Sequence, residues 1–594
     1  MSRFTTWRCN VPSNRQSLAL IIVALGLATN VSAREPYEVT IETNVTMKTR
    51  DGVTLGADVY RPKAEGKFPV LLERTPYDKH RMTYAGVGFG VKAAAQGYVY
   101  IIQDCRGRFT SEGDWYPFKY ESQDGYDTVE WAAALPYSSG KVGLVGMSYV
   151  GVTQMLTAVA APPHLAGILP VITGSNYHEN WTYQGGALAQ SFDQGWTTYF
   201  AVDTLSRRAL KDTSRARGDM VLPLGDYPVL VPGTSSALAD YYLDWLAHPR
   251  YDDYWKQWSI EEQFSKIMVP GFHVAAWYDL FQDGSLKNYL GIKAQGGSEA
   301  ARNNQRLLVI AGGHAGLTPR IGDIDFGKES VPGIPALTLR WYDYVLKGID
   351  DGLGREKPVK IFVMGKNAWR EEEDWPLARA QSTRYYLRSA GKANTLSGDG
   401  TLSTSPPASE APDKYVYDPA DPVPTRGGPV PLHGPAGPVD QRPTESREDV
   451  LVYTTPAFQK DTEVTGPVSL ELYVSSSAVD TDFTGKLIDV WPNGNAESLI
   501  DGILRARYRN SIEKAEFMNP GEVYKLTINL WSTSNVFLAG HKLRLEVSSS
   551  NFPRFDRNLN TGEDPESGTR MVKATNLIYH DRDHASAVVI PIVP

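Results

Sequence analysis

The chain has 594 residues, of which 42% are hydrophobic and 22% are charged, and its formal net charge is −8. This composition is ordinary for a globular protein, and the length allows about three domains. The acidic balance, with no run of Lys or Arg, argues against binding to nucleic-acid phosphates, which requires a basic face.

The first 33 residues have the layout of a secretory signal peptide. Three arginines precede the apolar run 18–28, and the small residues of 31–33 then form a cleavage site. A membrane-spanning helix needs about 20 apolar residues, so cleavage after Ala33 is favoured over an uncleaved interfacial anchor. No later stretch has the length and apolarity of a membrane span. We therefore expect a bacterial protein that is exported, either to the periplasm or to the medium, and that keeps only Cys105, as a packed thiol.

An α/β pattern follows the leader. The segment 37–60 alternates around Asp51-Gly52 as a hairpin does, and the next apolar runs and helical periods alternate along the chain: strands at 68–77, 98–107 and 141–146, helices at 81–97, 125–135 and from 149. The same alternation resumes at 267–279 and 306–314. This pattern predicts a mainly parallel sheet, built from residues 34–174 and 266–355.

Two further regions differ in character. Residues 175–265 are rich in aromatic and polar residues, with a helical stretch at 235–248, and we interpret them as a helical cap inserted into the sheet. Residues 388–448 are dense in Pro, Gly and Ser, and strict alternation follows at 468–477, 524–531 and 542–550. Half-buried strands of this kind are typical of an antiparallel sandwich, which we place in residues 356–594.

The sequence Gly-Met-Ser-Tyr-Val-Gly at 146–151 nearly matches G-x-S-x-G, the turn that exposes a nucleophilic serine. Ser148 follows an apolar strand and opens a helix, which is the context that this motif requires. Gly146 would let the backbone pass closely, and Gly151 lies one residue late, where a small residue would ease the packing of the helix on the sheet. Such a motif also occurs by chance, so it needs partners elsewhere in the chain.

A serine hydroxyl needs a base and an orienting carboxylate. His314 ends an apolar strand in a glycine-rich turn, and Asp279 ends the candidate strand before it. Both would lie at the carboxyl edge of a parallel sheet, in the chain order Ser, Asp, His that α/β-hydrolases use. The alternatives are a solvent-facing loop residue for His314 and a helix N-cap for Asp279.

Acyl transfer also needs donors for the developing oxyanion. The backbone N–H of Tyr149, directly after the serine, is the usual first donor. The second comes from a loop after an early strand, here 74–79, which has no glycine pair but contains Tyr77, whose phenol could donate. The alternative for Tyr77 is a packed aromatic residue in a turn.

Several long segments resemble the CocE/NonD family of bacterial serine hydrolases, which includes cocaine esterase and is related to X-Pro dipeptidyl-peptidases. They include DGVTLGADVYRP, RTPYDK, GMSYVGVTQ, YDPADPVPT and SSSAVDTDFTGKLIDVWPNG, and the resemblance covers essentially all of the chain after the leader. It implies an α/β-hydrolase domain, a helical cap and a C-terminal jelly-roll sandwich. It also implies a Ser148, Asp279 and His314 triad without a cofactor or metal, and an oxyanion hole made by the Tyr77 hydroxyl and the Tyr149 amide.

The resemblance further implies an aromatic acyl pocket formed by Trp181, Trp196 and Phe281, although ordinary core packing is the alternative for these three. In the sandwich loop the family's Leu-Phe pair is replaced by Pro431-Leu432, which puts benzoyl-ester specificity in doubt. Related α-amino acid ester hydrolases carry an acidic pair just after the triad acid; Phe281 and Gln282 stand there in this chain, which disfavours that activity.

We therefore expect an esterase that acts on a small-molecule ester, with β-lactam or other amide acylase activity and X-Pro dipeptidyl-peptidase activity as the enzymatic alternatives. An exported polysaccharide-binding protein is the non-enzymatic alternative, and a homodimer is left open. The His-Asp-Arg-Asp-His segment at 580–584 is not on a helix, so its two histidines are not expected to hold a metal.

Overall fold

The structure is a computed structural model that describes residues 35–81, 88–207, 222–227, 239–314, 317–429, 436–564 and 566–594. The proposed leader, residues 1–33, lies outside the described residues. Tyr37–Pro594 forms one compact unit. Within the described residues, no helix combines the length and the apolar character needed to cross a membrane.

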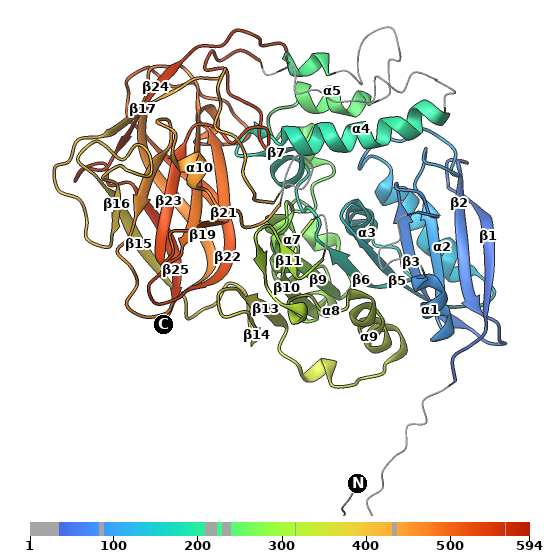
Figure 1. Ribbon diagram of the computed structural model, residues 1–594. Helices are drawn as coiled ribbons and strands as arrows, with labels where there is room; N and C mark the ends of the chain where they lie inside the picture. Colours follow the sequence, from blue (N-terminus) through green and yellow to red (C-terminus); the bar gives the residue numbers. More distant parts are fainter. Residues whose placement is uncertain are drawn as a thin grey trace, which may run out of the picture. The chain divides into compact units, whose positions relative to one another are not determined.

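The sheet of the α/β part has ten strands in the order β1-β2-β4-β3-β5-β6-β9-β10-β13-β14 (Figure 1). We call it the catalytic sheet, because its strands are expected to carry Ser148, Asp279 and His314. All neighbouring pairs from β4 to β13 are parallel, and the two edges are antiparallel. The strands are β1 (Val39–Lys48), β2 (Thr54–Pro62), β3 (Phe68–Thr75), β4 (Val99–Asp104), β5 (Ser138–Met147), β6 (Leu165–Val171), β9 (Gly271–Tyr278), β10 (Gln305–Gly313), β13 (Val359–Val363) and β14 (Ala368–Glu372). The central strands are buried on both faces, as in a sheet that helices cover on both sides.

Helices pack on both faces of this sheet. Apolar side chains of α1 (Phe89–Ala95) and α9 (Ile334–Lys347) share one core with one face of the strands. Those of α2 (Glu121–Ala134) and α3 (Tyr149–Val159) share another core with the opposite face, where α7 (Gln282–Gln295) also packs. A short helix, α8 (Glu299–Asn303), precedes β10. The helix expected at 81–97 is shorter than predicted, since it begins at Phe89; residues 82–87 lie outside the described part.

The catalytic sheet extends further than the sequence indicates. The strand pair β13–β14 continues it beyond residue 355, because β13 pairs in parallel with β10. The first strand of the sandwich is β15 (Gln381–Arg388). Residues 359–372, which lie after the boundary that we placed at residue 356, therefore pair with this sheet and not with the sandwich.

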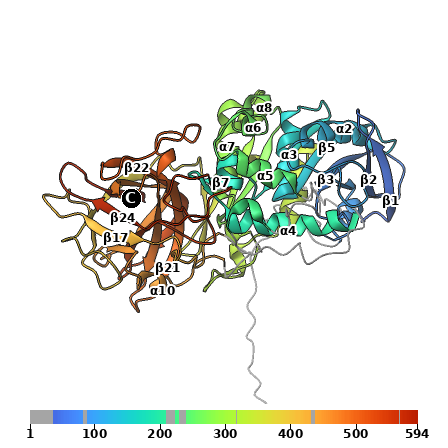
Figure 2. The same cartoon turned by 90° about the horizontal axis from the view of Figure 1, so that it is seen from above.

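Between β6 and β9 the chain forms the cap. Its described elements are η1 (His178–Thr182), the hairpin β7 (Tyr183–Gln184) and β8 (Ala187–Leu188), α4 (Gln190–Arg207), η3 (Leu224–Asp226), α5 (Asp240–Ala247), α6 (Asp253–Lys256) and η5 (Phe264–Lys266). In Figures 1 and 2, α4 begins beside β7, next to the sandwich, and runs from there across the hydrolase part. The cap aromatics share one continuous core with α2 and α3.

The C-terminal sandwich is built from strands, and nearly every pair of neighbouring strands is antiparallel. Besides β15 they are β16 (Thr401–Ser403), β17 (Asp413–Tyr417), β18 (Leu451–Thr454), β19 (Thr462–Ser476), β20 (Asp482–Val490), β21 (Ala496–Arg505), β22 (Tyr524–Phe537), β23 (Lys542–Ser548), β24 (Ala574–Tyr579) and β25 (Ala587–Val593). Alternate side chains of these strands meet in one apolar core. The fold is thus an α/β-hydrolase with a cap and a jelly-roll sandwich, as expected.

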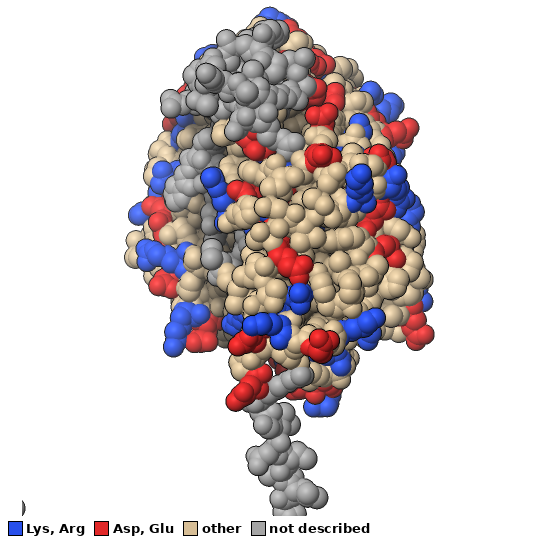
Figure 3. All heavy atoms as spheres, turned by 90° about the vertical axis from the view of Figure 1, so that its right-hand side faces the viewer, with Lys and Arg blue, Asp and Glu red and all other residues tan. Residues whose placement is uncertain are grey.

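The surface carries both signs of charge. On the face shown in Figure 3, basic and acidic side chains are interspersed in small groups. Ion pairs at the surface of the molecule include Arg50 with Asp127 and Arg340 with Glu356. This face therefore offers no broad basic field of the kind that nucleic-acid binding requires.

Candidate active site

Ser148 occupies a sharp turn between β5 and α3. Its backbone has φ 59° and ψ −127°, a strained conformation that is typical of an exposed nucleophile. Gly146, with φ 144°, cannot be larger, because a Cβ there would lie 2.0 Å from Cγ1 of Val150. The Ser148 N–H donates to the carbonyl of Val171 at 3.0 Å, which ties the turn to the next strand.

The late glycine has a packing role. A Cβ at Gly151 would lie 2.6 Å from Cβ of Thr173, just beyond the end of β6. The Thr173 hydroxyl in turn donates to the carbonyl of Ser148 at 2.9 Å. Gly151 therefore lets the first turn of α3 lie close against the neighbouring strand, which confirms our interpretation of the G-x-S-x-x-G spacing.

The structure brings Ser148, His314 and Asp279 together. The Ser148 Oγ lies 2.9 Å from Nε2 of His314, and Nδ1 of the same ring lies 2.7 Å from Oδ2 of Asp279. The other carboxylate oxygen accepts the backbone N–H of Phe281 at 2.7 Å. An ionised carboxylate can only accept, so Nδ1 carries the ring proton and Nε2 is free to accept from the serine. Asp279 is fully buried, whereas the His314 side chain is slightly exposed.

Tyr77 lies beside the serine. Burial raises the pKa of its phenol to about 12, although the Trp196 indole, the Ser148 side chain and the Tyr149 backbone amide all hydrogen-bond to it and act in the opposite direction. The Trp196 Nε1–H donates to this hydroxyl at 3.2 Å. The hydroxyl is therefore protonated at neutral pH, and because Trp196 uses it as an acceptor, its own proton is free to be donated.

The Tyr149 side chain is hydrogen-bonded to a buried carboxylate, that of Glu121, which sequence reasoning missed. Its hydroxyl accepts the N–H of Phe118 at 2.7 Å and donates to Oε1 of Glu121 at 3.1 Å. Glu121 forms a buried ion pair with Arg74, at 2.9 Å. Burial raises the pKa of Glu121, against the effect of this guanidinium. The only sequence signal is the pair of charged residues, Glu73 and Arg74, near the end of the apolar strand β3.

The three residues placed by resemblance gather next to the triad. Trp181 stacks on Phe281 with ring centroids 4.4 Å apart, and the Trp196 ring lies 5.6 Å from that of Trp181. The Phe281 ring meets the His314 ring edge-on at 5.1 Å. Other aromatic residues extend this wall, and sequence reasoning did not single them out: Trp115, Phe192 and Phe200. Pro431 and Leu432, which we placed near the pocket, lie outside the described residues.

Gln282, at a position where acidic residues stand in α-amino acid ester hydrolases, has a structural role. Its side-chain amide donates to the carbonyls of Trp277 and Ser532, at 2.9 and 2.8 Å, and accepts the N–H of Ser532 at 3.0 Å. Ser532 belongs to β22 of the sandwich. The residue therefore links the first turn of α7 to the C-terminal domain.

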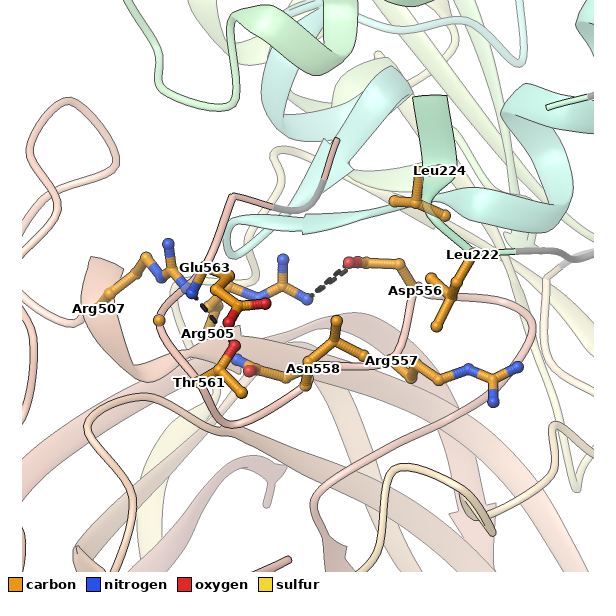
Figure 4. Close-up of a pocket in the computed structure, with 11 residues that line it drawn as sticks. Leu222, Leu224, Arg505, Arg507, Asp556, Arg557, Asn558, Thr561 and Glu563 are labelled. Carbon is orange, nitrogen blue, oxygen red and sulfur yellow. Dashed lines mark hydrogen bonds and ion pairs between the residues drawn. The ribbon is translucent and has the colours of Figure 1, made fainter. Parts of the chain in front are cut away.

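A second junction joins the sandwich to the cap (Figure 4). Here a hollow of about 20 Å³ lies between Leu222 and Leu224 of the cap and charged residues of the sandwich. Arg505 bonds Asp482 and Asp556, each at 3.0 Å, and Asp556 accepts the N–H of Leu188 in the β7–β8 hairpin at 2.7 Å. Because these charges are paired with one another, the hollow is a joint between domains and not a substrate site.

Two further expectations concern thiols and metals. Cys105 is fully buried, and burial raises the pKa of its thiol, so it is inert as a nucleophile. Among the described residues, no group of three or more His, Cys, Asp or Glu side chains is arranged to hold a metal ion. His580 of the 580–584 segment is buried, with Nε2 bonded to Asp413 at 2.8 Å.

Comparison with known proteins places these features in one family. Residues 51–316 match the model of the X-Pro dipeptidyl-peptidase (S15 family), and residues 351–589 match that of the X-Pro dipeptidyl-peptidase C-terminal non-catalytic domain. The cocaine esterase of Rhodococcus sp. (strain MB1 Bresler) is 39% identical over 579 residues, which cover 93% of this chain and 98% of the esterase.

Solved structures show the same fold. An aminopeptidase from the marine sediment archaeon Thaumarchaeota archaeon is 25% identical, with a TM-score of 0.80 and coverage of 94% of this chain and 97% of the other. An α-amino acid ester hydrolase is 22% identical, with a TM-score of 0.77 and coverage of 95% and 99%.

Proposed function

The chain belongs to the CocE/NonD family of serine hydrolases and is a serine ester hydrolase, and we propose that it cleaves carboxylic esters through an acyl-enzyme formed on Ser148. The observation that carries this proposal is the continuous chain of contacts from Ser148 through His314 to Asp279, at 2.9 and 2.7 Å. These are the distances that proton transfer from a nucleophile to a general base requires.

In the first step, Nε2 of His314 takes the proton of Ser148 while Oγ attacks the ester carbonyl. The tetrahedral intermediate collapses, the imidazolium gives the proton to the departing alkoxide, and the alcohol leaves. Water then enters, loses a proton to His314 and attacks the acyl carbon; the bond from this carbon to the Ser148 Oγ breaks, the proton returns to Oγ, and the carboxylic acid leaves. Asp279 holds the imidazole in the correct tautomer and stabilises the imidazolium.

The developing oxyanion would be stabilised by the Tyr77 hydroxyl and the Tyr149 backbone N–H. Burial supports this assignment, because it keeps the pKa of Tyr77 at about 12, so the group remains a donor. The position of Tyr149, directly after the serine, and its anchoring through Glu121 support a fixed amide direction. Donors that are fixed before the reaction stabilise the transition state without reorganisation.

The acyl group would lie against Trp181, Trp196 and Phe281. Their mutual ring contacts and the Phe281–His314 contact support an aromatic pocket next to the nucleophile. We expect small or aromatic acyl groups to be preferred over long chains. A panel of p-nitrophenyl butyrate, phenylacetate and benzoate esters tests this, and best turnover on acyl chains beyond about ten carbons would contradict it.

Ser148→Ala tests the mechanism as a whole. We expect turnover of p-nitrophenyl butyrate to fall to the residual rate that substrate binding and the oxyanion donors supply without a nucleophile, with no phosphonylated enzyme detected by mass spectrometry after a phosphonate ester is added. Unchanged turnover would show that the nucleophile lies elsewhere.

Amide cleavage is the second candidate, because the catalytic domain matches the X-Pro dipeptidyl-peptidase model. Matched p-nitrophenyl ester and p-nitroanilide substrates with the same acyl group, including an X-Pro anilide, separate the two. We expect the ester to be preferred over its matched anilide, and we expect substrates that carry an ammonium group to be poor, since Phe281 and Gln282 leave no acidic pair to hold it.

Export is a separate proposal that rests on the sequence of residues 1–33. We propose that the leader is removed after Ala33 during secretion. N-terminal sequencing of the protein recovered from the periplasm and the medium should begin at Arg34, and a full-length chain confined to the cytoplasm would refute it.

A further inference from the structure

Arg108 is a completely buried arginine near the active site, in the loop that follows β4. Its guanidinium lies over the rings of Trp115 and Phe200, with the central carbon 5.0 and 4.5 Å from the ring centroids. A guanidinium stays charged in proteins, and burying it is costly unless it is paired and hydrogen-bonded. Its partners therefore show what this position does.

These partners come from two separate segments. On one side, the Nε–H of Arg108 donates to the carbonyl of Pro76 at 3.2 Å, and Pro76 directly precedes Tyr77. On the other side, Nη2 forms an ion pair with Asp203 of α4 at 3.1 Å, and Nη1 donates to the carbonyl of Phe200 in the same helix at 3.4 Å. One planar group thus joins the Tyr77 loop to the cap helix.

The same helix contacts Tyr77 directly. The Phe200 ring stacks on the Tyr77 ring with centroids 5.3 Å apart and an interplanar angle of 29°. One turn earlier in α4, the Trp196 indole donates to the Tyr77 hydroxyl. The direction of this hydroxyl therefore depends on how α4 is placed against the Tyr77 loop. Arg108 contacts both the loop and the helix.

We propose that Arg108 and Asp203 form a positioning pair that sets the direction of the Tyr77 hydroxyl towards the oxyanion. The pair acts through Tyr77, because Arg108 contacts the residue before it and the helix beside it. This inference rests on the proposed role of Tyr77 in the oxyanion hole. An arginine is required, because the several N–H groups of its planar guanidinium reach the carbonyls of Pro76 and Phe200 and the carboxylate of Asp203 together. The single ammonium group of a lysine cannot contact all three.

A cycle of four proteins tests the pair: the original chain, Tyr77→Phe, Arg108→Met and the double variant. A misplacement of about 1 Å can cost about 100-fold in rate, so we expect Arg108→Met to lower kcat on p-nitrophenyl butyrate by about 10- to 100-fold with little change in KM. In the Tyr77→Phe background, the same substitution should change kcat by less than about threefold, because the group that it positions is already absent.

The outcomes separate this inference from the function on which it rests. If Tyr77→Phe is slow but the effects of the two substitutions multiply, Arg108 does not act through Tyr77 and the inference is wrong. If Tyr77→Phe is as fast as the original protein, the oxyanion assignment is wrong and the inference falls with it. The esterase mechanism itself is judged separately by Ser148→Ala.

Two further variants guard against a loss of folding. Asp203→Asn keeps the shape of the partner and leaves Arg108 in place; we expect the same non-additivity with Tyr77→Phe and a smaller fall in kcat. Arg544→Met is the matched control, since it removes a buried arginine that pairs with Glu445 in the sandwich, at 2.6 Å. This control should lower the melting temperature. If it changes kcat at all, the change should be the same factor in the original chain as in the Tyr77→Phe background, because the two substitutions act independently.

Discussion

Removing one oxygen atom from Tyr77 is the sharpest test of the proposed oxyanion hole. In Tyr77→Phe the ring can keep its stack on Phe200, so the loop and the cap helix retain their main contact. What is lost is the hydroxyl that lies beside Ser148 and accepts the Trp196 N–H. The substitution therefore removes a donor to the reacting carbonyl with little other change.

The size of the effect follows from the number of donors. With the Tyr149 N–H in place, one of two donors remains. Loss of a single oxyanion donor costs about 100- to 1,000-fold in kcat, or about 2.7–4 kcal/mol of transition-state stabilisation. Because the interaction is made in the transition state and not with the bound ester, KM should change little.

The pH dependence gives a second readout. Burial raises the pKa of Tyr77 to about 12, which favours the neutral form, so the phenol keeps its proton until the pH approaches that value. The ratio of kcat between the original protein and Tyr77→Phe should therefore stay constant from about pH 7 to about pH 10. A phenol with the ordinary pKa of 10.0 would lose its proton in the upper part of this range, and the ratio would fall there.

The assay is steady-state hydrolysis of p-nitrophenyl butyrate, with kcat and KM measured separately at each pH. Tyr98→Phe is the matched control. Its hydroxyl donates to Asp343 at 2.7 Å, in the core on the α1 and α9 side of the sheet, so its removal should reduce stability and leave kcat unchanged. A fall of less than about fivefold for Tyr77→Phe would refute the oxyanion assignment.

Three further changes test the triad, the packing of the turn at Ser148, and the buried His273. Asp279→Asn should lower kcat by about 10⁴-fold with an unchanged melting temperature, because the imidazole takes the wrong tautomer; a fall of less than tenfold would contradict its role. Gly151→Ala should cost about 1–3 kcal/mol of unfolding free energy in urea titrations, because the new Cβ would lie 2.6 Å from that of Thr173. Gly333→Ala, with nothing within 4 Å, should cost less, since it loses only the preference for glycine at the N-cap of α9. His273 is buried, which lowers its pKa from 6.5 to about 4, so the unfolded chain binds more protons between these values and stability falls as the pH drops through them. His273→Gln should remove about 3 kcal/mol of this loss at about pH 4, and an unchanged slope of unfolding free energy against pH would contradict the shift.

The sequence predicts that Ser148, Asp279 and His314 meet, and the structure brings them together for a topological reason. In a parallel sheet every strand ends at the same edge, so polar residues that follow apolar strands are brought together whatever the details of packing. The apolar runs that mark β5, β9 and β10 are therefore sufficient to predict their meeting. The proposed oxyanion donor Tyr77 follows from the same edge, because the loop after β3 also lies there.

Other features depend on partners that are distant in the sequence. The segment of β13 and β14 has the same alternation as sandwich strands, and only its pairing with β10 assigns it to the catalytic sheet. Arg74 and Arg108 read as ordinary charged residues, because nothing near them in the sequence indicates Glu121 or Asp203 as partners. Buried ion pairs of this kind are visible only when the fold brings their elements together.

The contacts of the sandwich give it a part in the geometry of the site. It contacts the β7–β8 hairpin at the end of each strand. The N–H of Arg505 donates to the carbonyl of Gly185 at 2.8 Å, after β7. At the end of β8, the Leu188 N–H donates to the Asp556 carboxylate, and the Asp556 N–H donates to the Leu188 carbonyl. A Cβ at Gly185 would lie 2.1 Å from the carbonyl oxygen of Ile503, so the hairpin fits closely against β21.

This hairpin leads directly into α4, which supplies the Trp196 donor to Tyr77 and the carboxylate of Asp203 to Arg108. On the other side of the site, Gln282 fixes the turn after Asp279 to β22. Both the Tyr77 loop and Asp279 therefore contact elements that the sandwich anchors. Because oriented donors are effective only when they are held rigidly, we expect the sandwich to contribute to the rate although it carries none of the proposed reacting groups.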